Sequence, residues 1–149
     1  MDKPHQRIGS ISNAHVGADF EKLALLYFEK QGTKLIRNFP LDIGVNKKKK
    51  KHCFDLGSAN LKIIVECKSH KWTSGGKVPS AKMTTWNEAM LYFHLAPQDF
   101  KKVFFTLHDK RQDTGETLVA YYKRTYLHLI PEGVEFLEYD ESTGDIIRE

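Results

Sequence analysis

Hydrophobic and polar residues alternate most clearly along residues 61–69, LKIIVECKS. Successive side chains on a strand point to opposite faces, so Glu66 and Lys68 are predicted to share one face while Val65 and Cys67 face a core. A carboxylate and an ammonium on a half-buried strand face need compensation, because burying either charge is costly. A divalent metal and a phosphate together would compensate both.

The same reading divides the rest of the chain into elements. Thr85 and Glu88 form a capping-box pattern that begins a helix, and Pro97 ends it. Residues 1–12 are predicted to be a loose arm and residues 140–149 an acidic tail. Strands are predicted over 34–43, 52–56, 61–69, 103–108 and 134–139, and helices over 14–31, 85–96 and 113–129.

This order, α-β-β-β-α-β-α-β, predicts an α/β protein whose central mixed β-sheet is flanked by helices on both faces. The chain has 149 residues, of which 40% are hydrophobic and 28% charged, as expected for one globular domain. No apolar run is long enough for a membrane span, and the N-terminal residues lack a signal-peptide core. With only two cysteines, Cys53 and Cys67, we expect a cytoplasmic protein with reduced thiols.

Charge is distributed unevenly along the chain. Residues 44–82 contain ten lysines against two acids, whereas residues 132–149 contain seven acids and one arginine. The lysine-rich block surrounds Asp55 and Glu66, which favours a polyanionic partner at that site; the alternative is a set of solvated surface lysines. The lysines expected to contact nucleic-acid phosphates are Lys47, Lys48, Lys49, Lys50, Lys51, Lys71, Lys77 and Lys82.

Asp55 is the other acid of the lysine-rich block, and it lies on the predicted strand that precedes the strand of Glu66. With a two-residue turn at residues 58–59, Asp55 pairs near Lys62 and shares a face with Glu66. Four residues then separate the two carboxylates along the strand, roughly 13 Å. Both can reach one ion only if the hairpin twists or bulges, and Gly57 is the residue expected to permit that distortion.

Two carboxylates on neighbouring strands predict a site for a hard cation. Carboxylate oxygens suit Mg²⁺, with Mn²⁺ as a substitute, and substrate phosphate and water complete such sites. Lys68 beside them could position the attacking water or hold the phosphate. The set of Asp55, Glu66 and Lys68 therefore predicts phosphodiester hydrolysis.

These residues resemble the motif of the PD-(D/E)XK nuclease superfamily, which has a restriction-endonuclease-like fold. The resemblance covers residues 16–108: Glu21 in GADFE, Asp55 in FDLG, and Glu66 with Lys68 in VECKS, within an αβββαβ core. The pattern is similar to the branch with archaeal junction resolvases and small restriction enzymes. One departure is that Phe54 stands where many members have proline.

The resemblance implies a role for each matching residue. Asp55 and Glu66 would hold Mg²⁺ with the Cys67 backbone carbonyl, Lys68 would serve the water, and Glu21 would support the metal site from its helix. The implied substrate is DNA. Double-strand cutting implies a homodimer, with helix 85–96 or the C-terminal segment as its interface. Since no recognition domain is evident, a partner protein could supply specificity.

Other interpretations compete with this one. The protein could be a catalytically inactive nucleic-acid-binding module of the same fold, or a structural protein whose basic loop binds an acidic partner. Glu21 could be an ordinary exposed carboxylate paired with a nearby lysine. Trp72 and Trp86 could stack on bases, although packing in the core is the simpler expectation. A zinc site has little support, because its candidates lack a CxxC spacing: His52, Cys53, Cys67 and His70.

Overall fold

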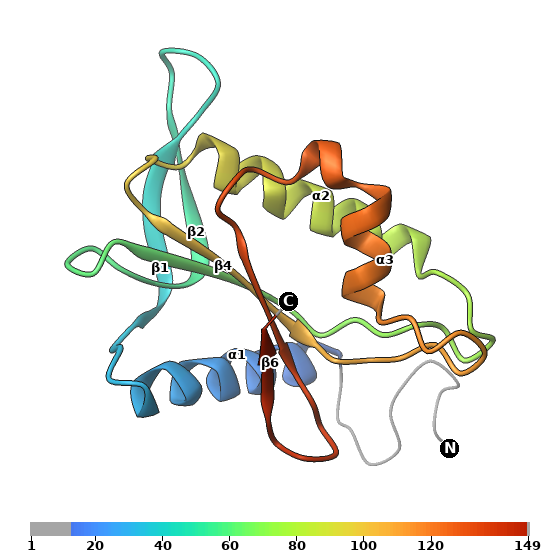
Figure 1. Ribbon diagram of the computed structural model, residues 1–149. Coiled ribbons are helices and arrows are strands. Elements are labelled where there is room, and N and C mark those ends of the chain that lie inside the picture. Colours follow the sequence, from blue (N-terminus) through green and yellow to red (C-terminus); the bar gives the residue numbers. More distant parts are fainter. Residues whose placement is uncertain (1–12, 149) are drawn as a thin grey trace.

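Residues 13–148 are described by a computed structural model of the chain, so the predicted arm at residues 1–12 lies outside the described part. The elements are α1 (Asn13–Lys30), β1 (Ile36–Ile43), β2 (Lys50–Ser58), β3 (Ile63–Lys68), α2 (Ser80–Leu95), β4 (Lys101–Leu107), α3 (Leu118–Thr125), η1 (Leu127–Leu129), β5 (Glu135–Tyr139) and β6 (Ile146–Arg148). Figure 1 shows their arrangement.

The six strands form one mixed sheet in the order β1-β2-β3-β4-β5-β6. β3, β4 and β5 are parallel, and the pairs β1–β2, β2–β3 and β5–β6 are antiparallel. Helix α1 lies on one face of this sheet, and α2 and α3 lie on the other (Figure 1). The predicted α/β class, with a mixed sheet flanked by helices on both faces, is therefore confirmed.

Alternation along the strands gives the sheet two hydrophobic cores. One core forms under α1, where Phe20, Ala24 and Phe28 meet β-strand residues that include Val65 and Phe105. The other forms under α2 and α3, where Trp86, Phe93 and Tyr122 meet residues that include Ile64 and Phe104. The predicted core positions Val65 and Cys67 lie on the α1 side, with Val65 buried and Cys67 packed against that core.

Helix α2 begins a turn earlier than the capping-box pattern predicted. Thr85 lies inside the helix, and its hydroxyl donates a hydrogen bond to the carbonyl of Lys82 rather than capping the first turn. Most apolar side chains of α2 pack inside the molecule, although Leu91 is exposed. The buried residues of α2 are Met83, Trp86, Ala89, Met90 and Phe93.

The C-terminal third also differs from the prediction. The helix expected over 113–129 is shorter: Thr117 caps α3, and its hydroxyl accepts a hydrogen bond from the Ala120 N–H at 3.0 Å. The segment predicted as an acidic tail begins with a turn that includes Gly144 at φ +79°. The acidic segment that follows contains β6, which pairs with the edge of β5. Alternation over three residues was too short to identify this strand.

Candidate active site

The register between β2 and β3 places Asp55 opposite Glu66. Leu56 pairs with Val65, and Ser58 pairs with Ile63. One further step in the same register sets residue 55 across from residue 66. The predicted two-residue turn at residues 58–59, which paired Asp55 with Lys62, is therefore wrong: the turn spans residues 59–62, and the side chain of Asp55 interacts with that of Glu66.

The two strands separate at this position. The β2–β3 ladder ends at the pair Leu56–Val65, although both strands continue. Beyond it, the Cys67 backbone N–H donates a hydrogen bond of 2.8 Å to Oδ2 of Asp55. The carbonyl of an extended residue points to the same side as its N–H, so the Cys67 carbonyl also faces this gap. The gap thus gathers two carboxyl groups and one backbone carbonyl.

A distortion of β2 centred on Asp55 turns its side chain into this gap. Phe54 belongs to the core under α2, whereas Leu56 belongs to the core under α1. Residues two apart on a regular strand share a face, so the strand rotates between them. Across from Asp55, Asn38 has a left-handed backbone with φ +53°, and the β1–β2 register skips this pair. Asparagine tolerates this conformation better than most residues.

Gly57, where the distortion was expected, pairs regularly with strands on both sides. Its role is packing: a Cβ built at Gly57 would lie 2.5 Å from ring atoms of Phe39. The sequence thus predicted a distorted hairpin correctly but placed the irregularity two residues too late.

Glu66 is 6% exposed and is held by His52. Nε2 of His52 lies 3.0 Å from Oε1 of Glu66. The imidazole stacks on the ring of Tyr92 from α2, with centroids 3.7 Å apart, and meets the Phe54 ring edge-on. Burial is the main cause that lowers the pKa of His52. Sequence analysis missed this role, because no spacing rule links a histidine on one strand to a glutamate on the next.

Burial perturbs the ionisation of both carboxyl groups, and the charge of Glu66 adds to the effect on Asp55. Burial, followed by the charge of Glu66, raises the pKa of Asp55 to about 7, while the Cys67 N–H and Lys68 oppose the change. Burial likewise raises the pKa of Glu66 to about 7, opposed by Asp55 and Lys68. Two buried carboxyls that resist ionisation together are a recognised mark of a functional site, and a cation would relieve both.

Glu21 reaches the same site from α1. Its carboxylate accepts a hydrogen bond of 3.2 Å from Nη2 of Arg37, so its partner is this arginine of β1 rather than a lysine of its own helix. Burial and the charge of Asp55 raise the pKa of Glu21, whereas Arg37 and Lys68 lower it. The structure therefore brings Glu21, Asp55, Glu66 and Lys68 within electrostatic reach of one another.

The described residues contain no group of three or more histidine, cysteine, aspartate or glutamate side chains arranged to hold a metal ion. Two of the zinc candidates have other partners: His70 accepts a hydrogen bond from Nε1 of Trp86, and His52 is engaged with Glu66. A Mg²⁺ site can be built from fewer protein side chains, such as two carboxylates with one backbone carbonyl. Mg²⁺ usually keeps several waters and takes further oxygen ligands from substrate phosphate.

The predicted nucleic-acid-binding lysines lie in three places. Lys47–Lys49 lie in the loop of the β1–β2 hairpin, and Lys50 and Lys51 belong to β2 instead of the expected loop. Lys77 lies between β3 and α2, and Lys82 in the first turn of α2. Lys71 forms an ion pair of 2.6 Å with Glu141, so an acid of the C-terminal segment competes with any phosphate there.

Both tryptophans belong to the core, which confirms the expectation that they pack inside the protein. Trp86 is completely buried and Trp72 is 8% exposed. The Nε1 of Trp72 donates to the carbonyl of Glu116 at 3.1 Å, which fixes the loop after β3 against the loop after β4.

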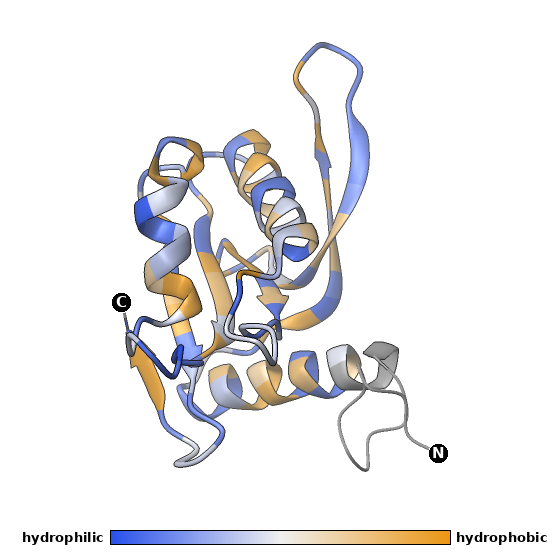
Figure 2. Cartoon of the chain, turned by 90° about the vertical axis from the view of Figure 1, so that its right-hand side faces the viewer, coloured by the Kyte–Doolittle hydropathy of each residue, from blue (hydrophilic) through white to orange (hydrophobic). Residues whose placement is uncertain are grey.

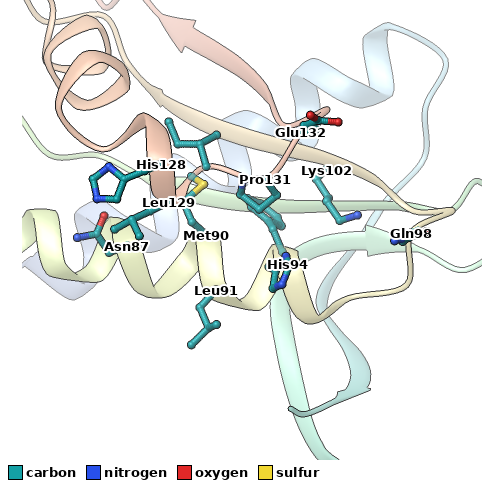
Figure 3. Close-up of a pocket in the computed structure, with 12 residues that line it drawn as sticks. Asn87, Met90, Leu91, His94, Gln98, Lys102, His128, Leu129, Pro131 and Glu132 are labelled. Carbon is teal, nitrogen blue, oxygen red and sulfur yellow. The ribbon is translucent and has the colours of Figure 1, made fainter. Parts of the chain in front are cut away.

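A cavity of about 770 Å³ lies elsewhere, between α2 and the segment around η1 (Figure 3). Its lining includes Leu91, His94 and Leu129, and none of the predicted site residues. Comparison of the chain with protein-family models, curated proteins and solved structures found no match. In the described part of the chain, no helix has the length and apolar character needed to cross a membrane.

Proposed function

We propose that this protein is a Mg²⁺-dependent endonuclease that hydrolyses phosphodiester bonds of DNA. The observation that carries the proposal is the facing pair Asp55 and Glu66, placed where β2 and β3 separate. Glu66 is buried and Asp55 is partly buried, and both have their pKa raised to about 7. Such a pair is unfavourable on its own at neutral pH, so it is better explained by cation binding than by stabilisation of the fold.

The proposal includes a restriction-endonuclease-like core. The elements from α1 to β4 run in the order αβββαβ, as in the PD-(D/E)XK superfamily. Glu21 lies on the first helix, Asp55 on the second strand, and Glu66 with Lys68 on the third, as in the family motif. This agreement in element order and motif position supports the proposed membership.

The donor atoms suit Mg²⁺, or Mn²⁺ in its place. Two carboxylates and the Cys67 carbonyl are hard oxygen ligands directed into one gap, whereas the Cys67 side chain packs against the core under α1. A bound cation would polarise the scissile phosphate and stabilise the negative charge that develops in the transition state.

The side chains around the gap have separate roles in this proposal. Lys68 shares a strand face with Glu66, and its ammonium lowers the pKa of both carboxyl groups, which favours their ionised form. The same ammonium can orient the attacking water and contact the phosphate. His52 fixes the orientation of the Glu66 carboxylate, and Glu21 adds negative charge from α1.

A cleavage assay tests the proposal directly. Supercoiled plasmid and branched DNA would be incubated with MgCl₂ and either the wild-type protein, Lys68→Ala, or the control Lys101→Ala. Lys101 is an exposed lysine at the start of β4, and it forms an ion pair with Glu135 of β5. We expect cutting by the wild type and the control, a loss of at least about a hundredfold in Lys68→Ala, and DNA affinity within a few-fold in all three.

The other outcomes separate the alternatives. Equal cutting by Lys68→Ala excludes this mechanism. DNA binding without cutting, unaffected by EDTA, identifies an inactive nucleic-acid-binding module. Salt-sensitive binding to an acidic protein but not to DNA identifies a structural protein with a basic loop.

We further propose that the enzyme acts as a homodimer, since a double-strand break requires two active sites. A partner protein that supplies specificity is compatible with the absence of a separate recognition domain among residues 13–148. Light scattering after gel filtration, with and without duplex DNA, measures the oligomeric state. A monomer under both conditions, together with nicking alone, would contradict the dimer and leave the chemistry intact.

A further inference from the structure

The β1–β2 hairpin extends beyond the sheet as a free two-stranded ribbon. β2 pairs with β3 only from Leu56 to Ser58, whereas its pairing with β1 continues outward to Ile43 and Lys50. Figure 1 shows this hairpin projecting past the rest of the molecule, and Figure 2 shows the same projection from the side. We call residues 39–54 the lysine ribbon.

The end of the lysine ribbon has a defined conformation. The Asn46 side chain accepts a hydrogen bond of 2.8 Å from the Lys48 N–H, and the Lys49 ammonium donates one of 2.9 Å to the Gly44 carbonyl. At Gly44 a Cβ would come within 2.9 Å of the Lys48 carbonyl oxygen, so the loop closes tightly over its own backbone. Val45 stands at this end with 83% of its surface exposed.

The lysine ribbon carries a net positive charge, because its five lysines face a single acid, Asp42, which lies opposite Lys51 in the β1–β2 register. All five side chains from Lys47 to Lys51 are exposed, and no ion pair joins them to a carboxylate in this part of the chain. Many cations elsewhere are paired: Arg37, Lys62, Lys71, Lys101, Arg111, Arg124 and Arg148. Five consecutive lysines without an ion pair to a described carboxylate therefore lie together at the projecting end.

The lysines also point to both sides of the ribbon. Successive side chains on β2 alternate, so Lys50 and Lys51 lie on opposite faces. A surface that lies flat on one phosphate strand needs charge on one face only. Charge on both faces suits a groove with a phosphate strand along each wall.

Two contacts join the base of the ribbon to the candidate active site. His52 contacts Glu66, and Asp55, one residue past the ribbon, accepts the hydrogen bond from Cys67. Lys49 lies six residues from Asp55 along nearly continuous strand, which is about 20 Å. The ribbon end is therefore held at a fixed distance from the carboxyl pair.

We infer that the lysine ribbon enters the major groove of double-stranded DNA and positions it against Asp55 and Glu66. The major groove of B-DNA is about 12 Å wide and accepts a two-stranded β-ribbon, and the exposed Val45 suits contact with thymine methyl groups there. The A-form groove of double-stranded RNA is too deep and narrow for side chains to read. The inference rests on the proposed function for the class of partner, and it specifies duplex DNA over RNA and over single strands.

Binding measurements test the inference separately from cutting. Labelled duplex DNA, duplex RNA and single-stranded DNA of one sequence would be titrated with the full chain in CaCl₂, between 50 and 200 mM salt. The ribbon variant is Lys47→Ala/Lys48→Ala/Lys50→Ala, which keeps the bond from Lys49 to Gly44. The matched control is Lys22→Ala/Lys30→Ala/Lys34→Ala, which removes three exposed lysines from α1 and the segment after it.

We expect the ribbon variant to lower the salt slope on duplex DNA by about 2 to 3, or about 0.9 per lost phosphate contact. The slopes on duplex RNA and single-stranded DNA should change by less than about 1, the effect of one contact. The control should leave the duplex DNA slope unchanged, and the triple Lys→Arg variant at the ribbon positions should restore it. Equal losses in ribbon and control variants, or equal losses on all three nucleic acids, would overturn the inference.

The two proposals can fail independently. If the wild type binds duplex DNA through the ribbon but does not cut in MgCl₂, the ribbon inference stands and the nuclease proposal falls. If the wild type cuts DNA and the ribbon variant binds and cuts equally well, the nuclease proposal stands and the ribbon inference falls.

Discussion

Replacing Asp55 with asparagine should make the protein more stable at alkaline pH while abolishing cleavage. Folded Asp55 keeps its proton up to about pH 7, whereas in the unfolded chain it releases it near its ordinary value of 3.8. Between these values the folded state binds more protons, so the free energy of unfolding falls as pH rises. The full cost of ionising this buried carboxyl is present above about pH 7.

The magnitude follows from that interval. At about 1.4 kcal/mol per pH unit, the difference between 3.8 and about 7 corresponds to roughly 4 kcal/mol. Asp55 is only partly buried and is coupled to Glu66, so solvent screening reduces the expected gain to about 2 kcal/mol. Asparagine is nearly isosteric and can still accept the Cys67 N–H. The expected rise in Tm at pH 8 is about 4 to 8 °C for a chain of this size.

Thermal unfolding of wild type and Asp55→Asn at pH 4 and pH 8, each with EDTA or MgCl₂, measures this effect. The two proteins should differ little in stability at pH 4, where folded Asp55 is protonated and the pH lies only just above its ordinary pKa of 3.8. At pH 8, Mg²⁺ should stabilise the wild type, by about 1.4 kcal/mol at ten times its Kd, and should affect the variant less. A variant less stable than the wild type at pH 8 would refute the reasoning, because Asp55 would then contribute to the fold.

Two further substitutions examine the surroundings of the pair. His52→Ala should weaken Mg²⁺ binding by about 10- to 100-fold, measured calorimetrically, because Glu66 loses the imidazole that orients it. His52→Gln should recover part of the loss. An unchanged Mg²⁺ affinity of His52→Ala would show that His52 only packs on Tyr92. Gly57→Ala should destabilise the protein by about 1 to 3 kcal/mol in urea unfolding, because the methyl group would meet the Phe39 ring; a neutral result would show that this ring can shift.

Alternation along the chain predicted five of the six strands of the described residues and the faces of the side chains on β3. Val65 and Cys67 turn toward the α1 core and Glu66 turns away, as the period of two requires. Helix α1 and its end near Gly32, which has φ +82°, also followed from local pattern. These features depend on residues adjacent in sequence or one helical turn apart.

Features set by tertiary contacts were beyond the same reasoning. Helix α2 begins at Ser80, after Pro79, without a side-chain cap, because burial of Met83 and Trp86 stabilises its first turns. The contact between His52 and Glu66 joins residues 14 apart on neighbouring strands, and it depends on the exact register of those strands. No local pattern specifies a contact of this kind.

The turn after β2 shows which part of a hairpin argument is robust. A two-residue turn and the observed turn at residues 59–62 place different residues opposite Asp55, Lys62 in one case and Glu66 in the other. These partners are four residues apart, an even number, so the face assigned to each side chain is the same in both registers. The expected separation of roughly 13 Å came only from the assumed turn. The left-handed backbone of Lys62, with φ +53°, and the bond from Leu61 N–H to Ser58 Oγ fix the longer turn. Lysine seldom adopts that conformation, so the sequence predicted which groups share a face but not that they face each other.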